Sequence, residues 1–401
     1  MVMNSRIKHI AHFDLDSFFV SVERLYNPEL AKKNKDGKMP PVVVGGSADK
    51  RGVVASASYE ARAYGVRSAM PVKTALRLCP HLVIVKGRHG TYSEISSKIV
   101  KRLHDFVPVI EQTSIDEGYM DLTGCEKLYS NDFPGALRML QTLVKEEFKL
   151  PISFGMGTTR VIAKIASGKA KPNGILIVDS ASAEKFLEAL DIDEIPGIGP
   201  KTAERLKRYG YRKVSQLQEM SEASLEQSLG KHGLDLYMVV HGKSSSDVMP
   251  ESERKSISSE ETFAADMPPD TDFESLFTPH IEEICHRLRT IGKKARTVTI
   301  KIRYEDFSTK TRAVSFSPTN DDAAIQRTVS KLFMELYNQK TPVRLIGVGL
   351  SNLTDPMPVT SELFTSHNAK RETILQSVDQ IRKKYGMNAI TVGPVRKKSD
   401  V

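Results

Sequence analysis

The feature that most constrains the fold of this chain is a stretch near residue 300 in which apolar and polar residues alternate without a break. Within residues 297–304, one set of alternate positions holds Val298, Ile300, Ile302 and Tyr304, and the other holds Thr297, Thr299, Lys301 and Arg303. Because successive side chains of a strand point to opposite faces, this pattern predicts a strand with one buried face and one face open to water or phosphate.

The segments around this strand follow a recognisable order. Apolar spacing predicts strands at 256–263, 297–304, 311–317 and 343–351, and helices at 273–291 and 322–338. The order β-α-β-β-α-β is the split βαβ arrangement, in which one face of the sheet packs on both helices. We therefore expect a separate module in the last third of the chain.

The first part of the chain has a different pattern. Apolar runs predict strands at 7–13, 42–44, 53–55, 110–122 and 152–157, and helices at 92–106 and 135–148. Short helices broken by glycine are expected from about residue 178, and a serine- and charge-rich stretch at 242–255 has the composition of a linker. The last ~50 residues are polar, and we expect them to be partly mobile.

Composition limits the class of protein. The 401 residues include 58 Lys and Arg against 49 Asp and Glu, and this net charge of +9 favours a polyanionic partner such as nucleic acid. No run of about 18 apolar residues and no signal-type segment is present. The three widely spaced cysteines support neither a disulfide framework nor a zinc site. A basic intracellular protein is expected, with no membrane association.

Two acidic motifs accompany predicted strands. Asp14-Leu15-Asp16 ends the first strand, and Asp116-Glu117 lies within the strand predicted at 110–122. Alternation sends Asp14 and Asp16 to one face, and Asp116 and Glu117 to opposite faces unless the strand ends or bulges there. Carboxylates brought together repel one another, so a native cluster holds divalent metal, and Mg²⁺ prefers such oxygen ligands. Taken alone, Asp-x-Asp also suits separate, solvated strand-end residues.

Five motifs occur in one order along the chain: FDLDSFF at 13–19, SASYEAR at 56–62, SIDE at 114–117, AKPNG at 170–174 and IPGIG at 195–199. In this order and spacing they resemble the Y-family translesion DNA polymerases, most closely those of bacteria, over about residues 7–353. The resemblance implies an α+β multidomain fold, a right-hand polymerase with palm, small fingers, helical thumb and a βαββαβ little finger.

The resemblance also divides the chain. It implies a palm at 1–17 and 88–177, fingers at 18–87, a thumb with a helix-hairpin-helix at 178–245, a linker at 246–255, a little finger at 256–354 and a C-terminal tail at 355–401. The implied enzyme is a low-fidelity, template-directed DNA polymerase that extends a primer with dNTPs by two-metal nucleotidyl transfer, in translesion synthesis and DNA repair. No domain is left for a proofreading exonuclease, and we expect a cytoplasmic, chromosome-associated monomer.

The resemblance gives roles to the acidic motifs. Asp14, Asp116 and Glu117 are implied to be catalytic, and two Mg²⁺ ions would be held by these carboxylates and by the Leu15 carbonyl. Asp16 is assigned less firmly, because it suits a supporting role. Gly118 stands where the family often has alanine, which adds backbone freedom beside a ligand.

The same resemblance implies nucleotide contacts. The residues concerned are Phe18, Phe19, Ser56, Tyr59, Arg62 and Lys171. Tyr59 and Arg62 are three apart and share a helix face, and arginine offers phosphate a planar fork. Phe19 is implied to exclude a ribose 2′-hydroxyl by its bulk. From the residues alone, an aromatic pair after a strand is more often core, and the charged side chains are more often solvated.

Basic and glycine-rich segments are implied to contact DNA. The residues are Gly197, Gly199, Lys201, Lys301, Arg303 and Arg312. Glycines in the turn let backbone N–H groups approach a phosphate. Residues 289–345 hold 12 Lys and Arg against 5 Asp and Glu, a local excess of +7. Without the resemblance, a tight interhelical turn and a solvated basic face explain these features equally well.

The tail adds a candidate partner. Thr360 to Phe364 (TSELF) resembles a sliding-clamp peptide that ends in Leu-Phe, but Thr360 replaces the usual glutamine. Two other functions stay open from sequence. A palm-like nucleotidyl cyclase uses similar carboxylates but needs neither the glycine turn nor the basic module, and a silent DNA- or clamp-binding scaffold needs no carboxylates.

Overall fold

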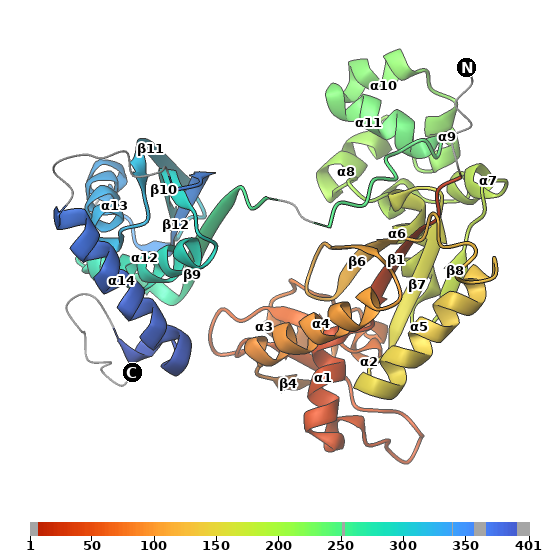
Figure 1. Cartoon of the computed structure of the whole chain (residues 1–401), viewed down its shortest axis with the longest axis horizontal. Coiled ribbons are helices and arrows are strands. Elements are labelled where there is room, and N and C mark those ends of the chain that lie inside the picture. Colours follow the sequence, from red (N-terminus) through yellow and green to blue (C-terminus); the bar gives the residue numbers. More distant parts are fainter. Residues whose placement is uncertain (1–6, 251–252, 339, 357–365, 391–401) are drawn as a thin grey trace. The chain divides into compact units, whose positions relative to one another are not determined.

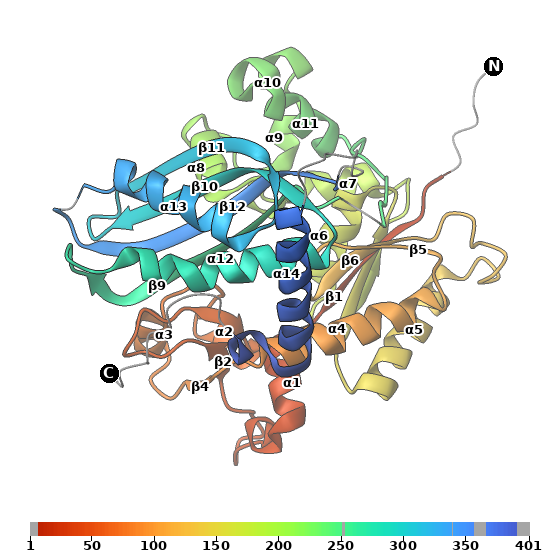
Figure 2. The same cartoon turned by 60° about the vertical axis from the view of Figure 1, so that its left-hand side comes forward.

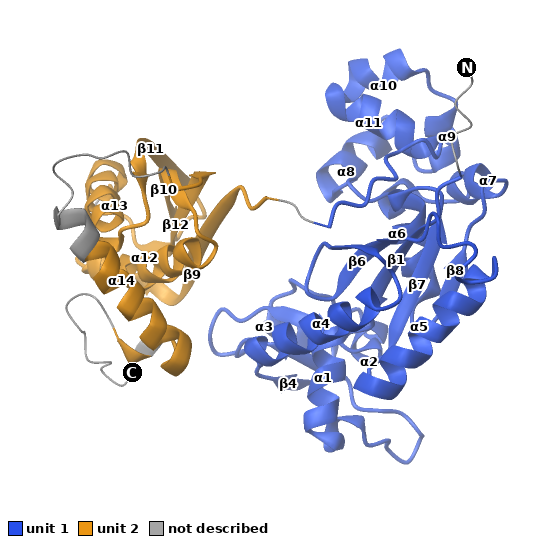
Figure 3. Ribbon diagram, viewed as in Figure 1, with its two compact units in different colours: residues 1–252 blue, residues 253–401 orange. Residues whose placement is uncertain are grey.

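The computed structural model describes residues 7–250, 253–338, 340–356 and 366–390. The chain forms two compact units, residues 1–252 and residues 253–401 (Figures 1 and 3). No helix in these described ranges is long and apolar enough to cross a membrane. Each unit has its own hydrophobic core and is considered separately below.

A five-stranded sheet forms the centre of the first unit. Its order is β5 (Val109–Gln112), β6 (Glu117–Asp121), β1 (Ile10–Leu15), β7 (Ile152–Gly157) and β8 (Ile175–Ile177). The central strand β1 is antiparallel to both neighbours. Because apolar residues occupy both of its faces, helices must cover the sheet on both sides.

The two faces of β1 meet different helices. Ala11, Phe13 and Leu15 pack in one core with residues of α4 (His89–His104) and α5 (Phe133–Phe148). Ile10 and His12 face the other way, toward α6 (Arg160–Ala170), where Ile10 packs with Ala163 and His12 contacts Ser167. Alternation therefore turns Asp14 to the α6 side of the sheet.

The single strand predicted at 110–122 is wrong, because the segment is a hairpin. Strands β5 and β6 pair with each other in antiparallel register, and residues 113–116 form the turn between them. The backbone N–H groups of Thr113 and Ser114 both donate to the Glu117 carbonyl and close this turn. Asp116 therefore lies in a turn and Glu117 begins the next strand.

A smaller sheet stands beside the first one in the same unit. Its order is β3 (Val54–Ala57), β2 (Val42–Gly45) and β4 (Val83–Val85), and its helices are α1 (Phe18–Tyr26), α2 (Tyr59–Ala63) and α3 (Val72–Leu78), with a 3₁₀ turn η1 (Pro28–Ala31). Val43, Val54 and Val72 belong to a separate small core. Ser58 caps α2 by accepting a hydrogen bond from the Ala61 N–H, which fixes where this helix begins.

Short helices complete the first unit. They are α7 (Ala183–Glu188), η2 (Ile192–Glu194), α8 (Pro200–Arg208), α9 (Val214–Gln218), α10 (Glu222–Leu229) and α11 (Lys231–Val240). Pro200 stands at the first position of α8, where its missing N–H costs no hydrogen bond. Gly197 has φ +95°, a left-handed conformation that favours glycine in the turn before this helix.

The second unit has the predicted β-α-β-β-α-β order. Its antiparallel sheet runs β11 (Thr309–Thr319), β10 (Lys294–Tyr304), β12 (Val343–Thr354) and β9 (Ser256–Met267), and its helices are α12 (Phe273–Thr290) and α13 (Asp322–Leu336). Val298, Ile300 and Ile302 are fully buried against these helices. The prediction of one buried face on this strand is confirmed.

The sequence pattern did not indicate the helix near the C-terminus. It is α14 (Ser366–Tyr385), which crosses α12 and is followed by η3 (Met387–Ala389) (Figure 2). Leu375 and Val378 are its buried apolar residues. The rest of the contact is ionic: Arg289 on α12 lies 2.6 Å from Asp379, and Arg382 lies 2.5 Å from Glu282. A segment that packs through charges has a polar sequence, which explains why apolar spacing did not predict this helix.

We predict that Arg382→Met destabilises the second unit by about 3 kcal/mol, because buried Glu282 loses a charged partner. The free energy of unfolding from urea denaturation of the full chain measures this. The double variant Arg382→Met/Glu282→Gln should recover part of the loss. Arg208→Met, which breaks an exposed pair with Glu204, should change the stability little. Equal effects of the two single variants would contradict the prediction.

Candidate active site

The pairing of β1 with β6 brings the acidic motifs together. Asp14 and Glu117 are direct register partners in the antiparallel ladder, so their side chains lie on the same face. The Leu15 N–H donates to the Asp116 carbonyl at 2.8 Å, which holds the turn of Asp116 against the end of β1. The predicted catalytic carboxylates thus gather at one end of the central sheet.

Two lysines and a histidine contact these carboxylates. Lys171 Nζ lies 2.5 Å from Asp14 Oδ2, and Lys164 Nζ lies 2.5 Å from Glu117 Oε2. His12 Nε2 lies 3.4 Å from the same Glu117 oxygen, and the His12 side chain is only 1% exposed. The site therefore combines buried negative charge with nearby cations.

Burial and neighbouring charges act differently on the two acids. Burial raises the pKa of Asp14 to about 6, against the pull of Lys171, and the Asp116 and Glu117 carboxylates raise it further. The His12 ring and the Lys164 ammonium lower the pKa of Glu117 to about 2. Asp14 is therefore the acid whose negative charge this site stabilises least, and it would gain most from an additional cation.

The oxygen atoms at this end of the sheet are of the kind that bind a divalent metal ion. Three carboxylates and the Leu15 carbonyl are hard oxygen donors of the kind that Mg²⁺ prefers. In the described ranges, no three or more His, Cys, Asp or Glu side chains are arranged as a ready metal-ligand group. Asp14 and Glu117 point instead to Lys171 and Lys164. The residue types fit the metal, and side-chain rotation would be needed to hold it.

Asp16 has a different environment from Asp14. It is 1% exposed and accepts hydrogen bonds from the Tyr59 hydroxyl at 2.8 Å, the Ser153 hydroxyl at 2.8 Å and the Asn173 N–H at 2.7 Å. With its oxygens occupied, this carboxylate is better suited to holding α2, β7 and the 171–174 turn together than to binding metal. Burial and the contact with Asp16 raise the pKa of Tyr59, so its hydroxyl stays protonated as a donor.

The predicted triphosphate residues lie around this end of the sheet. The Arg62 guanidinium stands 4.9 Å above the Tyr59 ring, and its Nε donates to the Ala57 carbonyl at 3.1 Å. Lys171 reaches the same region through its contact with Asp14. Ser56 lies on β3, next to Ala57, and is 9% exposed. The structure thus brings Tyr59, Arg62 and Lys171 to the carboxylates, whereas Ser56 is connected to them only through the β3 backbone.

The two phenylalanines have separate environments. Phe18 is 2% exposed and packs in the core, so its backbone is the part that remains for the predicted nucleotide contact. Phe19 is partly buried. Its ring stacks on Tyr92, with 4.4 Å between centroids and 12° between planes, and His89 meets it edge-on at 5.9 Å. These two aromatic contacts therefore limit the positions that the Phe19 ring can adopt.

Sequence reasoning missed the supporting residues of the site. Among them are His12, Ser153, Lys164 and Asn173. His12 precedes Asp14 by two residues on a strand, so alternation alone could have placed both on one face. Lys164 lies on α6, a helix that was not predicted from the sequence, so no signal pointed to it. Ser153 carried no local signal, because its role depends on pairing between strands distant in sequence.

The glycine turn before α8 is open. A Cβ atom built at Gly197 or Gly199 would meet no atom within 4 Å, so nothing in the described chain covers the backbone there. Lys201 follows in the first turn of α8 and is exposed. This leaves the turn accessible to an anionic group.

The basic residues of the second unit divide between two faces. Lys301 and Arg303 lie on the open face of the sheet, opposite Thr311 and Thr309. Arg312 is the register partner of buried Ile300, so it lies on the helix side, where it pairs with Glu335 of α13 at 2.9 Å. Arg312 therefore does not share the open face with Lys301 and Arg303, because a shift of one residue along a strand reverses the face.

Mostly small residues surround the basic pair on the open face. By strand register they are Ser256, Ser258, Thr262, Thr297, Thr299, Thr309, Thr311, Ala313, Ser315, Gly347, Gly349 and Ser351, and the larger Glu260 and Leu345 lie on the same face. Lys301 also pairs with Glu260 at 2.8 Å. A face with few large side chains lets a backbone of phosphates come close to hydroxyl, amide and ammonium donors.

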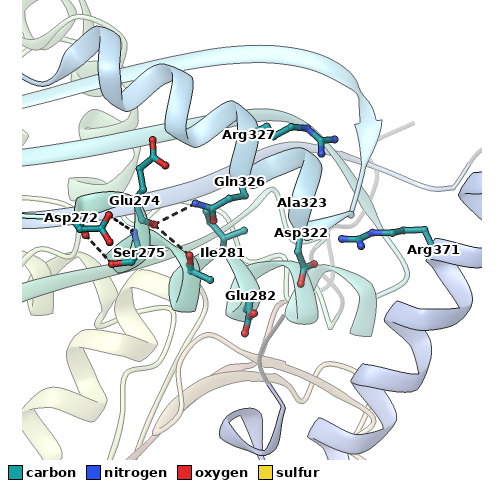
Figure 4. A pocket seen from close by; sticks show the side chains of 11 residues that line it. Asp272, Glu274, Ser275, Ile281, Glu282, Asp322, Ala323, Gln326, Arg327 and Arg371 are labelled. Carbon is teal, nitrogen blue, oxygen red and sulfur yellow. Dashed lines mark hydrogen bonds between the residues drawn. The ribbon is translucent and has the colours of Figure 1, made fainter. Parts of the chain in front are cut away.

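A cavity of about 420 Å³ in the second unit contains none of the predicted site residues (Figure 4). It lies beside the N-terminal halves of α12 and α13 and is bordered by Arg371 of α14. Arg371 pairs with Asp321 at 3.0 Å, and Gln326 donates to the Glu274 carbonyl. These wall residues already contact one another.

Comparison with known proteins gives one consistent result. The impB/mucB/samB family model matches residues 13–168, a DNA polymerase-iota thumb domain model matches 193–243, and the impB/mucB/samB C-terminal domain model matches 254–363. DNA polymerase IV of Dehalococcoides mccartyi is 38% identical over 98% of this chain and 99% of its own length. DNA polymerase IV of Treponema denticola is 36% identical over 96% of both. A solved Y-family DNA polymerase chimera has a TM-score of 0.74 and 28% identity, and the match covers 87% of this chain and 100% of that one.

We predict that Asp14→Asn becomes increasingly stabilising as pH rises from about 4 to about 6. Since the pKa of Asp14 is raised from 3.8 to about 6, the folded wild type keeps a proton that the unfolded chain releases, and wild-type stability falls across this window. Asparagine cannot ionise, so the difference should grow by up to about 3 kcal/mol. Urea denaturation in EDTA at several pH values measures it. A difference that stays constant with pH would contradict the prediction.

Proposed function

Since the chain belongs to the Y-family DNA polymerases, we propose that the carboxylates at the end of its central sheet perform two-metal nucleotidyl transfer. The chain is a DNA-directed DNA polymerase of translesion synthesis and DNA repair that binds primer-template DNA and dNTPs and depends on divalent metal ions. The palm-like cyclase and the silent scaffold, both open from sequence, do not agree with this membership.

The approach of Asp14, Asp116 and Glu117 is the observation that carries the mechanism. These carboxylates and the Leu15 carbonyl would hold two Mg²⁺ ions. When bound, the ions supply a lowered pKa for the primer 3′-hydroxyl and charge neutralisation for the leaving pyrophosphate. Glu117 would complete the site at the primer 3′-hydroxyl, and His12 and Lys164 lower its pKa, so that it stays ionised there.

The cationic residues would bind the triphosphate. Lys171 supplies an ammonium beside Asp14, and Arg62 supplies a planar fork that is held over the Tyr59 ring. Tyr59 donates its hydroxyl from a position set by Asp16. Ser56 is a further donor in this proposal. Together these groups would orient the α-phosphorus toward the primer end, which is the main task of a phosphoryl-transfer site.

Phe19 would select deoxyribonucleotides. Its stack on Tyr92 and its edge contact with His89 limit the positions that the ring can adopt. A braced ring beneath the sugar would collide with a 2′-hydroxyl and leave room for deoxyribose. Discrimination would therefore come from bulk and not from a hydrogen bond.

Structural regions take their roles from this mechanism. We assign the five-stranded sheet to the palm (1–17 and 88–177), the three-stranded sheet to the fingers (18–87), the short helices to the thumb (178–245) and the β-α-β-β-α-β module to the little finger (256–354). Gly197, Gly199 and Lys201 would contact DNA phosphates from the thumb, and Lys301 and Arg303 from the open face of the little finger. Arg312 is left out of this surface.

The proposal also covers the location, the oligomeric state and the fidelity of the enzyme. We propose a cytoplasmic monomer of low fidelity that lacks proofreading. The candidate clamp peptide, Thr360 to Phe364, lies outside the described residues. Clamp binding through it therefore rests on its sequence.

We predict that Asp116→Ala/Glu117→Ala lowers primer extension at least about 1000-fold, which corresponds to about 4 kcal/mol of transition-state stabilisation. Single-turnover extension of a labelled primer with Mg²⁺ measures this. Glu147→Gln, an exposed change on α5 of the same unit, is the matched control and should extend normally. Extension that persists without Asp116 and Glu117 would refute the mechanism.

We also predict different salt dependence for the two faces of the little-finger sheet. Lys301→Gln and Arg303→Gln should each reduce the slope of log affinity against log salt by about 1, because each removes one phosphate contact. Arg312→Gln, one strand away on the helix side, should leave the slope unchanged. Fluorescence anisotropy with labelled primer-template measures all three. A similar slope change in Arg312→Gln would contradict the assignment of faces.

A further inference from the structure

The segment that follows α11 is bound to the palm sheet before it leaves the first unit. Residues 244–250 contain no helix or strand. Three of their backbone groups nevertheless form hydrogen bonds with Arg160 of α6 and Glu111 of β5. The Ser245 carbonyl accepts from the Arg160 N–H at 3.2 Å, the Asp247 carbonyl accepts from Arg160 Nη1 at 2.9 Å, and the Met249 N–H donates to Glu111 at 2.8 Å.

Arg160 and Glu111 form one rigid pair. Both guanidinium nitrogens donate to the two carboxylate oxygens, at 2.8 Å and 2.7 Å, in the two-point geometry that gives the strongest ion pairs. The guanidinium also lies 4.3 Å from the Tyr119 ring centre. Arg160 is 26% exposed and Glu111 17%, so the pair is partly shielded from water and salt. Val248 packs beside it against a small core that includes Tyr119.

We propose that the Arg160–Glu111 pair is an anchor that holds residues 245–249 on the palm sheet and thereby shortens the length of chain that joins the two DNA-binding units. With the anchor closed, six residues (250–255) separate Met249 from β9. With the anchor open, twelve residues (244–255) separate Lys243, which ends the turn after α11, from β9. Arg160 and Glu111 are then positioning residues for DNA binding, and they touch neither substrate nor metal.

The consequence for DNA binding can be estimated. This inference rests on the proposed function, since both units must contact the same primer-template. Once one unit has bound, the effective concentration of the other falls roughly as the −3/2 power of the flexible linker length. Doubling that length should therefore weaken primer-template affinity about three-fold. The rate of extension at saturating DNA should not change, because the anchor lies outside the reacting groups.

The test compares Arg160→Met with Arg102→Met in the full-length protein. Arg102 makes the same kind of two-point pair, with Glu147 between α4 and α5, but it does not contact the linker. Hydrogen–deuterium exchange should become faster for residues 244–250 in Arg160→Met only. Anisotropy with a fluorescein-labelled primer-template should show an affinity loss of about three-fold in the same variant, with an unchanged single-turnover rate at saturating DNA. Arg160→Lys, which keeps the charge, should recover part of the affinity.

A second variant protects the test against misfolding. Six Gly and Ser residues inserted after Ser252 lengthen the linker without touching the palm and should also weaken affinity about three-fold. The insertion should have a smaller effect in Arg160→Met, because its linker is already long. Unchanged exchange at 244–250 in Arg160→Met, or unchanged affinity on insertion, would overturn the proposal. Neither result would affect the polymerase assignment, which the loss of extension in Asp116→Ala/Glu117→Ala tests separately.

Discussion

The candidate active site depends on the strand register that brings carboxylates together at one end of the central sheet. The register of β1 and β6 places Asp14 opposite Glu117, and the bond from the Leu15 N–H keeps the turn of Asp116 nearby. This arrangement is unfavourable for Asp14 in isolation, since burial and, to a smaller extent, the Asp116 and Glu117 carboxylates raise its pKa. Lys171 and Lys164 offset part of the repulsion. The remaining negative charge is what suits the site to metal ions and to chemistry on phosphates.

Much of the fold could be predicted from the sequence, because its strongest signals are local. Alternation in β10 correctly indicated a strand with one buried face, and helical spacing located α12. The pattern failed where the decisive contacts are distant in sequence. α14 packs through Asp379 and Arg382, whose partners lie about a hundred residues earlier, and no local pattern separates such a helix from a solvated tail.

At the candidate site, too, local motifs could be read from the sequence and distant contacts could not. Asp14, Asp116 and Glu117 could be named from motifs, but their surroundings could not. The hairpin that places Asp116 in a turn depends on pairing with β5, and the face occupied by Arg312 depends on strand register. Phe18 and Phe19 are adjacent residues of the same type, yet one is buried in the core and the other is only partly buried. A sequence identifies residue types, whereas register and packing decide which of them face a ligand.

Asp16 has a consequence for when this enzyme can become active. Its three hydrogen-bond donors come from Tyr59, Ser153 and Asn173, up to 157 residues away along the chain. Contacts of such long range form only after the intervening chain has been synthesised and folded. A ribosome-bound or proteolysed fragment that lacks the 171–174 turn therefore lacks the Asn173 bond to Asp16. This end of the central sheet can be assembled only once the chain extends beyond that turn.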